Sequence, residues 1–219
     1  MKEDSMTKLR VHNFVVSLDG YATGEEQSIE TPFGTAHNEF LHWFGAMHIF
    51  QGDTTGGHFG VDEALAATWA PGIGAEIMGR NKFRPTTGPW PEDGWRGFWG
   101  EEPPFHTPCF VMTHYPRPPM QVGETTFHFV EGTPAEVLAM ATDAAGGRDV
   151  RLGGGPSTVN QFLAADLVDY LHLVIVPIVL GRGIRLWDGL SGLHHRFRVE
   201  SATAPSGATH VFFDRTVRG

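Results

Sequence analysis

A run of three glycines, Gly153-Gly154-Gly155, carries the clearest chemical signal in the sequence. It follows a strand-like segment at 149–152 and precedes a helical pattern at 157–166. Glycines in this position let backbone N–H groups and the positive end of a helix approach an anion, usually a phosphate. The spacing departs from a dinucleotide-binding fingerprint, because Thr158 stands where G-x-G-x-x-G has its last glycine. A tight strand-to-helix turn without any ligand explains the glycines about equally well.

A second candidate site follows another strand, in the segment Met78-Gly79-Arg80-Asn81-Lys82. It places a cation beside a turn, although a solvated helix start is the commoner setting of a lone arginine. In open α/β sheets the ligand crevice lies beyond the carboxyl ends of the strands, where both segments fall. We therefore expect the two segments to contribute to one anion-binding site.

Aromatic residues, histidines and the single cysteine give weaker signals. Trp90, Trp95 and Trp99 lie in a Pro- and Gly-rich loop at 85–108, where they could stack on a planar heterocycle or pack the loop down. The chain has 12 histidines but no H-E-x-x-H or comparable cluster, so no metal site is expected. Cys109 begins a buried strand and is expected to act as a small apolar residue.

The order of the elements predicts an α/β fold. Strands are expected at 9–18, 75–78, 109–113, 126–130, 149–152 and 168–180, helices at 61–70, 134–145 and 157–166, and a terminal hairpin at 196–202 and 209–217. Alternating strands and helices favour a mostly parallel sheet, and the hairpin adds antiparallel strands. Residues 1–8 are expected to form a flexible N-terminus and 9–219 a single domain. Residues 22–60 lack a clean period, apart from a helix-like stretch at 37–50, and are expected to be a functional insertion.

Composition excludes several classes of protein. The chain has 219 residues, 41% of them apolar, which is typical of a globular domain. Its net charge of −9 disfavours general binding to nucleic acid. No apolar run approaches the roughly 20 residues of a membrane-spanning helix, and the N-terminal residues do not resemble a signal peptide. A cytoplasmic location without membrane or nucleic-acid partners is therefore expected.

Several of these segments, taken in order, resemble a known family. The segments 17–22 (SLDGYA), 78–80 (MGR) and 111–114 (VMTH), each after a strand, are similar to the dihydrofolate-reductase-like superfamily. The stretch LGGGPSTVNQFLAADLVDYLHLVIVPIVLGRGIRLW resembles the C-terminal reductase domain of the bifunctional riboflavin biosynthesis deaminase/reductase. The resemblance covers about residues 9–217 and identifies the chain as a stand-alone relative of that domain. It implies a three-layer α/β sandwich with a mostly parallel central sheet and a C-terminal antiparallel hairpin.

The same resemblance implies NADPH as the cofactor and assigns residues to it. The cofactor-binding residues that it implies are Gly79, Arg80 and Asn81 near the adenosine phosphates, Thr113 and His114 at the adenosine end, and Gly153, Gly154, Gly155, Ser157 and Thr158 at the pyrophosphate. Asp19 and Gly20 would line the nicotinamide and substrate cleft, with Asp19 as the catalytic candidate. Trp90 is a further candidate for contact with the substrate.

The sequence also departs from the family pattern. No H-x-E or P-C-x-x-C zinc signature of a deaminase is present, so only the reductase half is expected. The helix carboxylate that protonates the pterin in dihydrofolate reductases has no secure counterpart, because Asp62 and Glu63 are as easily charges that stabilise a helix start.

We therefore expect an NADPH-dependent reductase of a small, pyrimidine- or pterin-like nitrogen heterocycle, of the 5-amino-6-ribosylaminouracil-phosphate reductase type. The alternative is a non-catalytic NADP-binding or regulatory module on the same fold. A homodimer is expected because 168–180 and the terminal hairpin carry more apolar surface than one layer of helices covers.

Overall fold

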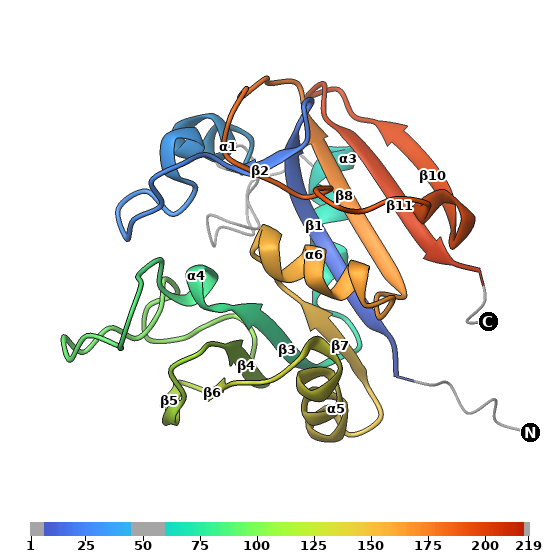
Figure 1. Ribbon diagram of the computed structural model, residues 1–219. Coiled ribbons are helices and arrows are strands. Elements are labelled where there is room, and N and C mark those ends of the chain that lie inside the picture. The colour runs from blue at the N-terminus through green and yellow to red at the C-terminus, as the bar shows by residue number, and fades with distance from the viewer. Residues whose placement is uncertain (1–6, 45–59, 217–219) are drawn as a thin grey trace, which may run out of the picture. The chain divides into compact units, whose positions relative to one another are not determined.

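The computed structural model describes residues 7–44 and 60–216 (Figure 1). Most of the predicted flexible N-terminus and part of the predicted insertion and of the 37–50 helix lie outside these residues. The chain divides into two compact units, one formed by residues up to Arg10 with Gly72–Asp169, the other by Val11–Pro71 with the residues from Tyr170 onward. Strand β1 (Leu9–Ser17) begins in the first unit and continues in the second.

The first unit has a mostly parallel sheet. Its strands, in hydrogen-bonded order, are β7 (Asp149–Leu152), β3 (Ile73–Gly79), β4 (Pro108–Met112), β6 (Thr125–Val130) and β5 (Arg117–Val122). The first four run parallel and β5 is antiparallel, while Leu9 and Arg10 of β1 pair with β7. Every residue of β3 is buried, as expected for a strand covered on both faces.

Three helices belong to this unit: α4 (Arg80–Phe83), α5 (Pro134–Ala145) and α6 (Pro156–Ala164). The predicted capping box of α5 is confirmed, because Thr133 N donates to Glu136 Oε2 (2.8 Å) and Glu136 N donates to Thr133 Oγ1 (3.3 Å). The helix ends at Gly146, whose φ of 59° is the left-handed conformation that glycine favours. Helices α4 and α6 each follow a parallel strand directly, so their first turns lie at the carboxyl ends of β3 and β7.

The second unit is built on antiparallel strands. In hydrogen-bonded order these are β10 (Phe197–Thr203), β11 (Thr209–Arg215) and β8 (Tyr170–Val176), with β1 beside β8. A two-stranded ribbon joins β2 (Tyr21–Thr23) to β9 (Ile184–Arg185). Helices α1 (His37–Phe44) and α3 (Val61–Ala66) and the 3-10 helices η1 (Gly34–Ala36), η2 (Ala67–Trp69) and η3 (Leu193–His195) complete it. Phe40 and Trp43 of α1 pack with Val174 and Val176 in its core.

The structure changes three of the expected elements. Strand β5 was missed because Pro118 and Pro119 argue against a strand, but β5 lies at the end of the sheet order, where proline is tolerated. The strand expected at 168–180 is shorter, since β8 ends at Val176 before Pro177. The helix expected at 61–70 changes to a 3-10 helix after Ala66. Among the described residues, no helix has the length and hydrophobicity that crossing a bilayer requires.

Candidate functional site

The glycine run is hydrogen-bonded to the end of strand β3. Gly153 N donates to Ile77 O at 2.8 Å, and Gly79 N donates to Gly154 O at 2.7 Å. A β-carbon at Gly79 would collide with the hydroxyl of Thr158 at the start of α6. The two segments that the sequence singles out therefore lie side by side in one unit, as predicted.

The start of α6 has an open side. Gly155 is the N-cap residue, with φ −75° and ψ −169°, and a β-carbon there would meet no atom within 4 Å. The exposed Ser157 follows, and neither its N–H nor that of Gly155 has a hydrogen-bond acceptor among the described residues. The N–H of Thr158, in contrast, donates to Gly155 O at 3.1 Å. Free N–H groups at the first turn of a helix are the donors that anions bind.

A second part of the site surrounds Trp90 in the long loop after α4. The Arg80 guanidinium lies 4.1 Å from the centre of the Trp90 ring and 5.3 Å from that of Tyr115. The Trp90 Nε1–H donates to the carbonyl of Tyr115 at 2.5 Å. Arg117, on β5, lies 4.6 Å from the same indole. Both guanidinium groups therefore lie within cation–π distance of the Trp90 ring.

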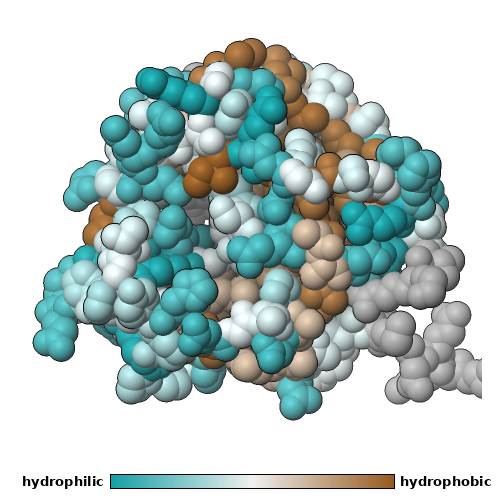
Figure 2. Space-filling model, viewed as in Figure 1, coloured by the Kyte–Doolittle hydropathy of each residue, from teal (hydrophilic) through white to brown (hydrophobic). Residues whose placement is uncertain are grey.

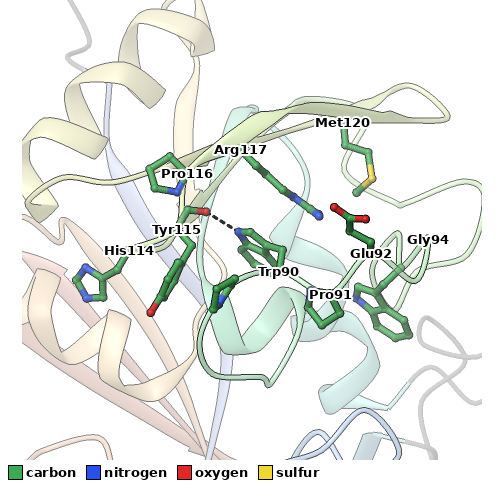
Figure 3. Close-up of a pocket in the computed structure, with 11 residues that line it drawn as sticks. Trp90, Pro91, Glu92, Gly94, His114, Tyr115, Pro116, Arg117 and Met120 are labelled. Carbon is green, nitrogen blue, oxygen red and sulfur yellow. Dashed lines mark hydrogen bonds between the residues drawn. The ribbon is translucent and has the colours of Figure 1, made fainter.

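Trp90, Tyr115 and Arg117 line a cavity of about 670 Å³ (Figure 3), whereas Arg80 lies against Trp90 but is not part of the lining. In Figure 3 the indole of Trp90 lies at its centre with Arg117 beside it, and Tyr115 and His114 flank one side. The lining residues are Pro89, Trp90, Pro91, Glu92, Gly94, Trp95, His114, Tyr115, Pro116, Arg117 and Met120. An aromatic wall with nearby guanidinium groups can take a planar ring that carries an anionic group.

The arginines near this cavity differ in their partners. Arg84 makes two hydrogen bonds to Asp93, at 2.6 and 2.5 Å, and this carboxylate raises the pKa of Arg84. Burial and, second, the charge of Arg84 lower the pKa of Arg117, and burial also lowers that of Arg80. Within the described part of the chain, the buried Nε atoms of Arg80 and Arg117 and the Nη2 atom of Arg117 have no hydrogen-bond acceptor. The site therefore holds unsatisfied cationic donors, which suit a phosphate.

The remaining cofactor candidates of this unit differ in their exposure and in their hydrogen bonds. The His114 ring is 91% exposed and its Nδ1 lies 3.3 Å from Glu131 Oε1. Thr113 is buried, and its hydroxyl accepts a hydrogen bond from the Tyr115 N–H at 3.1 Å, which fixes the turn into the cavity wall. Asn81 is exposed in the first turn of α4.

Asp19 and Gly20 belong to the second unit and form a turn after β1. The Asp19 carboxylate accepts hydrogen bonds from Ser17 Oγ (2.6 Å), Leu180 N (3.1 Å) and Gly181 N (2.7 Å). These bonds, the one from Ser17 foremost, lower the pKa of Asp19 to about 2. Gly20 has a φ of 85°, and a β-carbon there would lie 3.3 Å from Trp187. Asp19 is therefore ionised at neutral pH and ties the segment after β8 to this turn, and it has no proton to donate.

Sequence reasoning missed two functional candidates. Arg117 carries no signal in the sequence, since it stands between Pro116 and Pro118 in a segment that is not expected to be a strand. Lys82 was considered only as part of a helix start, yet its Nζ donates to Gly153 O at 2.5 Å. Glu76 could have pointed to this role of Lys82, because a carboxylate in a fully buried strand requires a cationic partner nearby.

The other two tryptophans of the loop pack it down. Trp95 Nε1 donates to Phe83 O at 2.9 Å, and the Trp99 ring stacks on Phe127 with 5.9 Å between ring centres. Among the described residues, no group of three or more His, Cys, Asp or Glu side chains could hold a metal ion.

Three solved structures share the architecture across nearly the whole chain. A protein from Shewanella sp. PV-4 named for riboflavin biosynthesis is 21% identical, with a TM-score of 0.59 over 97% of this chain and 100% of its own. A pyrimidine reductase-like protein from Corynebacterium diphtheriae is 16% identical, with a TM-score of 0.53 over 97% and 93%. Dihydrofolate reductase from Enterococcus faecalis, solved with NADP(H), is 12% identical, with a TM-score of 0.51 over 97% and 98%. These similarities show the dihydrofolate-reductase-like fold that the sequence predicted.

Sequence comparison gives the family. No curated protein matches the chain. The family model of the RibD C-terminal domain, in contrast, matches residues 10–211, which is most of the sequence. The chain therefore belongs to the RibD C-terminal domain family of reductase-like proteins.

Proposed function

We propose that this protein is an NADPH-dependent reductase of a small nitrogen heterocycle, of the 5-amino-6-ribosylaminouracil-phosphate reductase type. The observation that carries the proposal is the pairing, within one unit, of an open helix start at Gly155 with unsatisfied arginine donors beside Trp90. A dinucleotide phosphate needs both features, because it carries a pyrophosphate and a separate phosphate on its adenosine ribose.

The residues present fit NADPH. The N–H groups of Gly155 and Ser157 would hold the pyrophosphate, while Arg80 and Arg117 would bind the ribose phosphate. The cavity around Trp90 would take the adenosine end, so the position of Trp90 beside Arg80 supports a cofactor contact in place of the substrate contact expected from the sequence. NADPH, when bound, supplies the hydride, and the protein contributes position and charge.

A second function is favoured by one observation. Asp19, the catalytic candidate, is held as a carboxylate by its hydrogen bonds and its pKa of about 2. A non-catalytic NADP-binding or regulatory module would keep the cofactor site without a proton donor. NADPH oxidation that depends on an added pyrimidine or pterin substrate supports the reductase, and binding without turnover supports the module.

A matched pair of glycine variants tests the cofactor site. Gly155 and Gly60 are both N-cap residues in extended backbone (φ −75° and −78°), and a β-carbon at either meets no atom within 4 Å. Both Gly155→Ala and Gly60→Ala should cost little stability, in the range of a few tenths to 1 kcal/mol. Gly155→Ala should weaken NADPH binding at least tenfold, because its methyl group occupies the side that the pyrophosphate approaches, whereas Gly60→Ala should bind normally. Equal affinities of the two variants in a fluorescence titration would remove the glycine run from the proposal.

A further inference from the structure

A cluster of ionisable side chains lies directly beneath the glycine run. Glu76 of β3 is paired in register with Arg151 of β7 on one side and with Cys109 of β4 on the other. Glu76 is fully buried, and Arg151 Nη1 lies 3.2 Å from Glu76 Oε1. Lys82 of α4 completes the cluster through its hydrogen bond to Gly153 O (2.5 Å).

Gly153 is in contact with these charges. A β-carbon at Gly153 would lie 2.6 Å from Lys82 Nζ, 3.4 Å from Glu76 Oε2 and 3.6 Å from Arg151 Nη2. A side chain at Gly153 would therefore displace the Lys82 ammonium group, which stands at the end of a flexible side chain. The bond from Lys82 to the Gly153 carbonyl adds to the backbone bonds that hold the run to β3.

The cluster also sets the local charge. Protonation of Lys82 adds one positive charge to the cluster, beside the guanidinium group of Arg151. Charges beneath a backbone loop are poorly screened, so an anion bound on the loop would interact with them strongly.

The charge of Lys82 changes near neutral pH. The residue is partly exposed, but burial of its ammonium group and, second, repulsion from Arg151 lower its pKa to about 7, against the attraction of Glu76. Burial raises the pKa of Glu76, and Arg151 and Lys82 oppose that change. Burial also raises the pKa of the Cys109 thiol, which stays protonated.

We propose that Lys82 is a positioning residue of the cofactor site, which fixes the Gly153 carbonyl and takes up a proton when a pyrophosphate binds on the glycine run. This inference rests on the proposed function, because it takes the pyrophosphate of NADPH as the anion. A bound anion attracts the ammonium form of Lys82 more than the neutral amine, so NADPH binding raises the proton affinity of Lys82. NADPH therefore binds more tightly below pH 7 than above it, with proton uptake largest near pH 7.

The experiment is a calorimetric titration of NADPH from pH 6.5 to 8.5, in buffers of different ionisation enthalpy that report the protons taken up. The wild type is compared with Lys82→Met, which is neutral at all these pH values, and with Lys82→Arg, which stays charged. Lys8→Met is the matched control, because Lys8 is exposed in the same unit. The ribose phosphate of NADPH titrates in every one of these proteins, so differences between them belong to Lys82.

The wild type and Lys8→Met should lose affinity several-fold between pH 6.5 and 8.5 and take up part of a proton near pH 7. Lys82→Met should bind at least fivefold more weakly at pH 6.5, and neither Lys82 variant should show the extra proton uptake. If Lys82→Met does not fold, Lys82→Arg decides the matter, because its affinity should vary less with pH than that of the wild type.

Two outcomes overturn the inference, and they differ from each other. A wild type that binds NADPH with the same pH dependence and proton uptake as the Lys82 variants removes the role of Lys82 alone. A wild type that does not bind NADPH at any pH removes the proposed function, and this inference with it.

Discussion

Among single residues, we propose that Arg80 and Arg117 make the protein prefer NADPH to NADH. Both guanidinium groups lie against Trp90 and keep buried donors without acceptors among the described residues. Desolvated cationic donors gain most from a doubly charged ligand, because a charge-assisted hydrogen bond contributes about 1.5–3 kcal/mol. Arg84 cannot serve in this way, since Asp93 already takes two of its donors.

Arg80→Ala should therefore weaken NADPH binding by about 1.5–3 kcal/mol, or roughly 10- to 150-fold, and change NADH binding little. Calorimetric titration of both cofactors measures the difference. Arg96→Ala is the control, because Arg96 pairs with Glu101 in the same unit and should leave both affinities unchanged. Equal losses for NADPH and NADH in Arg80→Ala would show that Arg80 does not recognise the ribose phosphate.

At the scale of elements, a buried hydrogen-bonded chain joins two strands and a helix of the second unit. His172 Nε2 of β8 lies 2.8 Å from His210 Nδ1 of β11, and His210 Nε2 lies 2.9 Å from Asp62 Oδ1 of α3. The imidazole of His210 therefore bridges the Asp62 carboxylate and the His172 ring. Asp62 therefore anchors α3 to the sheet. The sequence allowed two other roles for it, a catalytic acid or a charge that stabilises the start of a helix.

Because His172 is part of this hydrogen-bonded row, the free energy of unfolding depends on pH. Burial, and second the proximity of His210, lower the pKa of His172 to about 3, below its ordinary 6.5. The unfolded chain takes up the proton first, so the contribution of His172 is complete above about pH 6.5 and is lost as the pH falls toward 3. The free energy of unfolding should fall by about 1.4 kcal/mol per pH unit from this residue.

Urea unfolding at pH 7.0 and 5.0 measures this loss. His172→Phe, which keeps an aromatic ring beside Phe212, should be less stable at pH 7 but should lose less on acidification than the wild type. The exposed His195→Phe should behave as the wild type does. The same acid-induced loss in the wild type and His172→Phe would contradict the assignment.

Some of these elements could be predicted from the sequence and others could not. Strands such as 149–152 and the capped helix at 134–145 were predictable, because buried periodicity and capping residues act locally. Strand β5 was not, since its prolines are permitted only by its place at the sheet edge. The proximity of Gly79 to the glycine run was also predictable, because the carboxyl ends of strands meet at one edge of a parallel sheet. Arg117 over Trp90 and Lys82 beneath Gly153 are contacts between segments far apart in sequence, which no local pattern encodes.

At the scale of the whole molecule, we propose a homodimer. In the second unit the side chains of Leu18 and Val179 are 62% and 72% exposed. They lie near each other, because Leu18 N donates a hydrogen bond to Ile178 O. Figure 2 shows apolar residues gathered along the upper rim, over the loop that follows β8 in Figure 1. Exposed apolar surface of this kind favours association with a second copy.

Light scattering at micromolar concentration should report about twice the 24.0 kDa of one chain. The double variant Leu18→Ser with Val179→Ser should shift the population toward the monomer without a large change in unfolding temperature. A wild type of 24.0 kDa under these conditions would rule out the proposed dimer.

We propose that this fold holds NADPH at the glycine run and in the Trp90 cavity, and calorimetric titration of the wild-type protein with NADPH is the direct test. We expect one NADPH per chain, bound at least tenfold more tightly than NADH, because the ribose phosphate meets Arg80 and Arg117. No binding of NADPH at millimolar concentration by a folded protein, or equal affinities for NADPH and NADH, would rule out the proposed cofactor site.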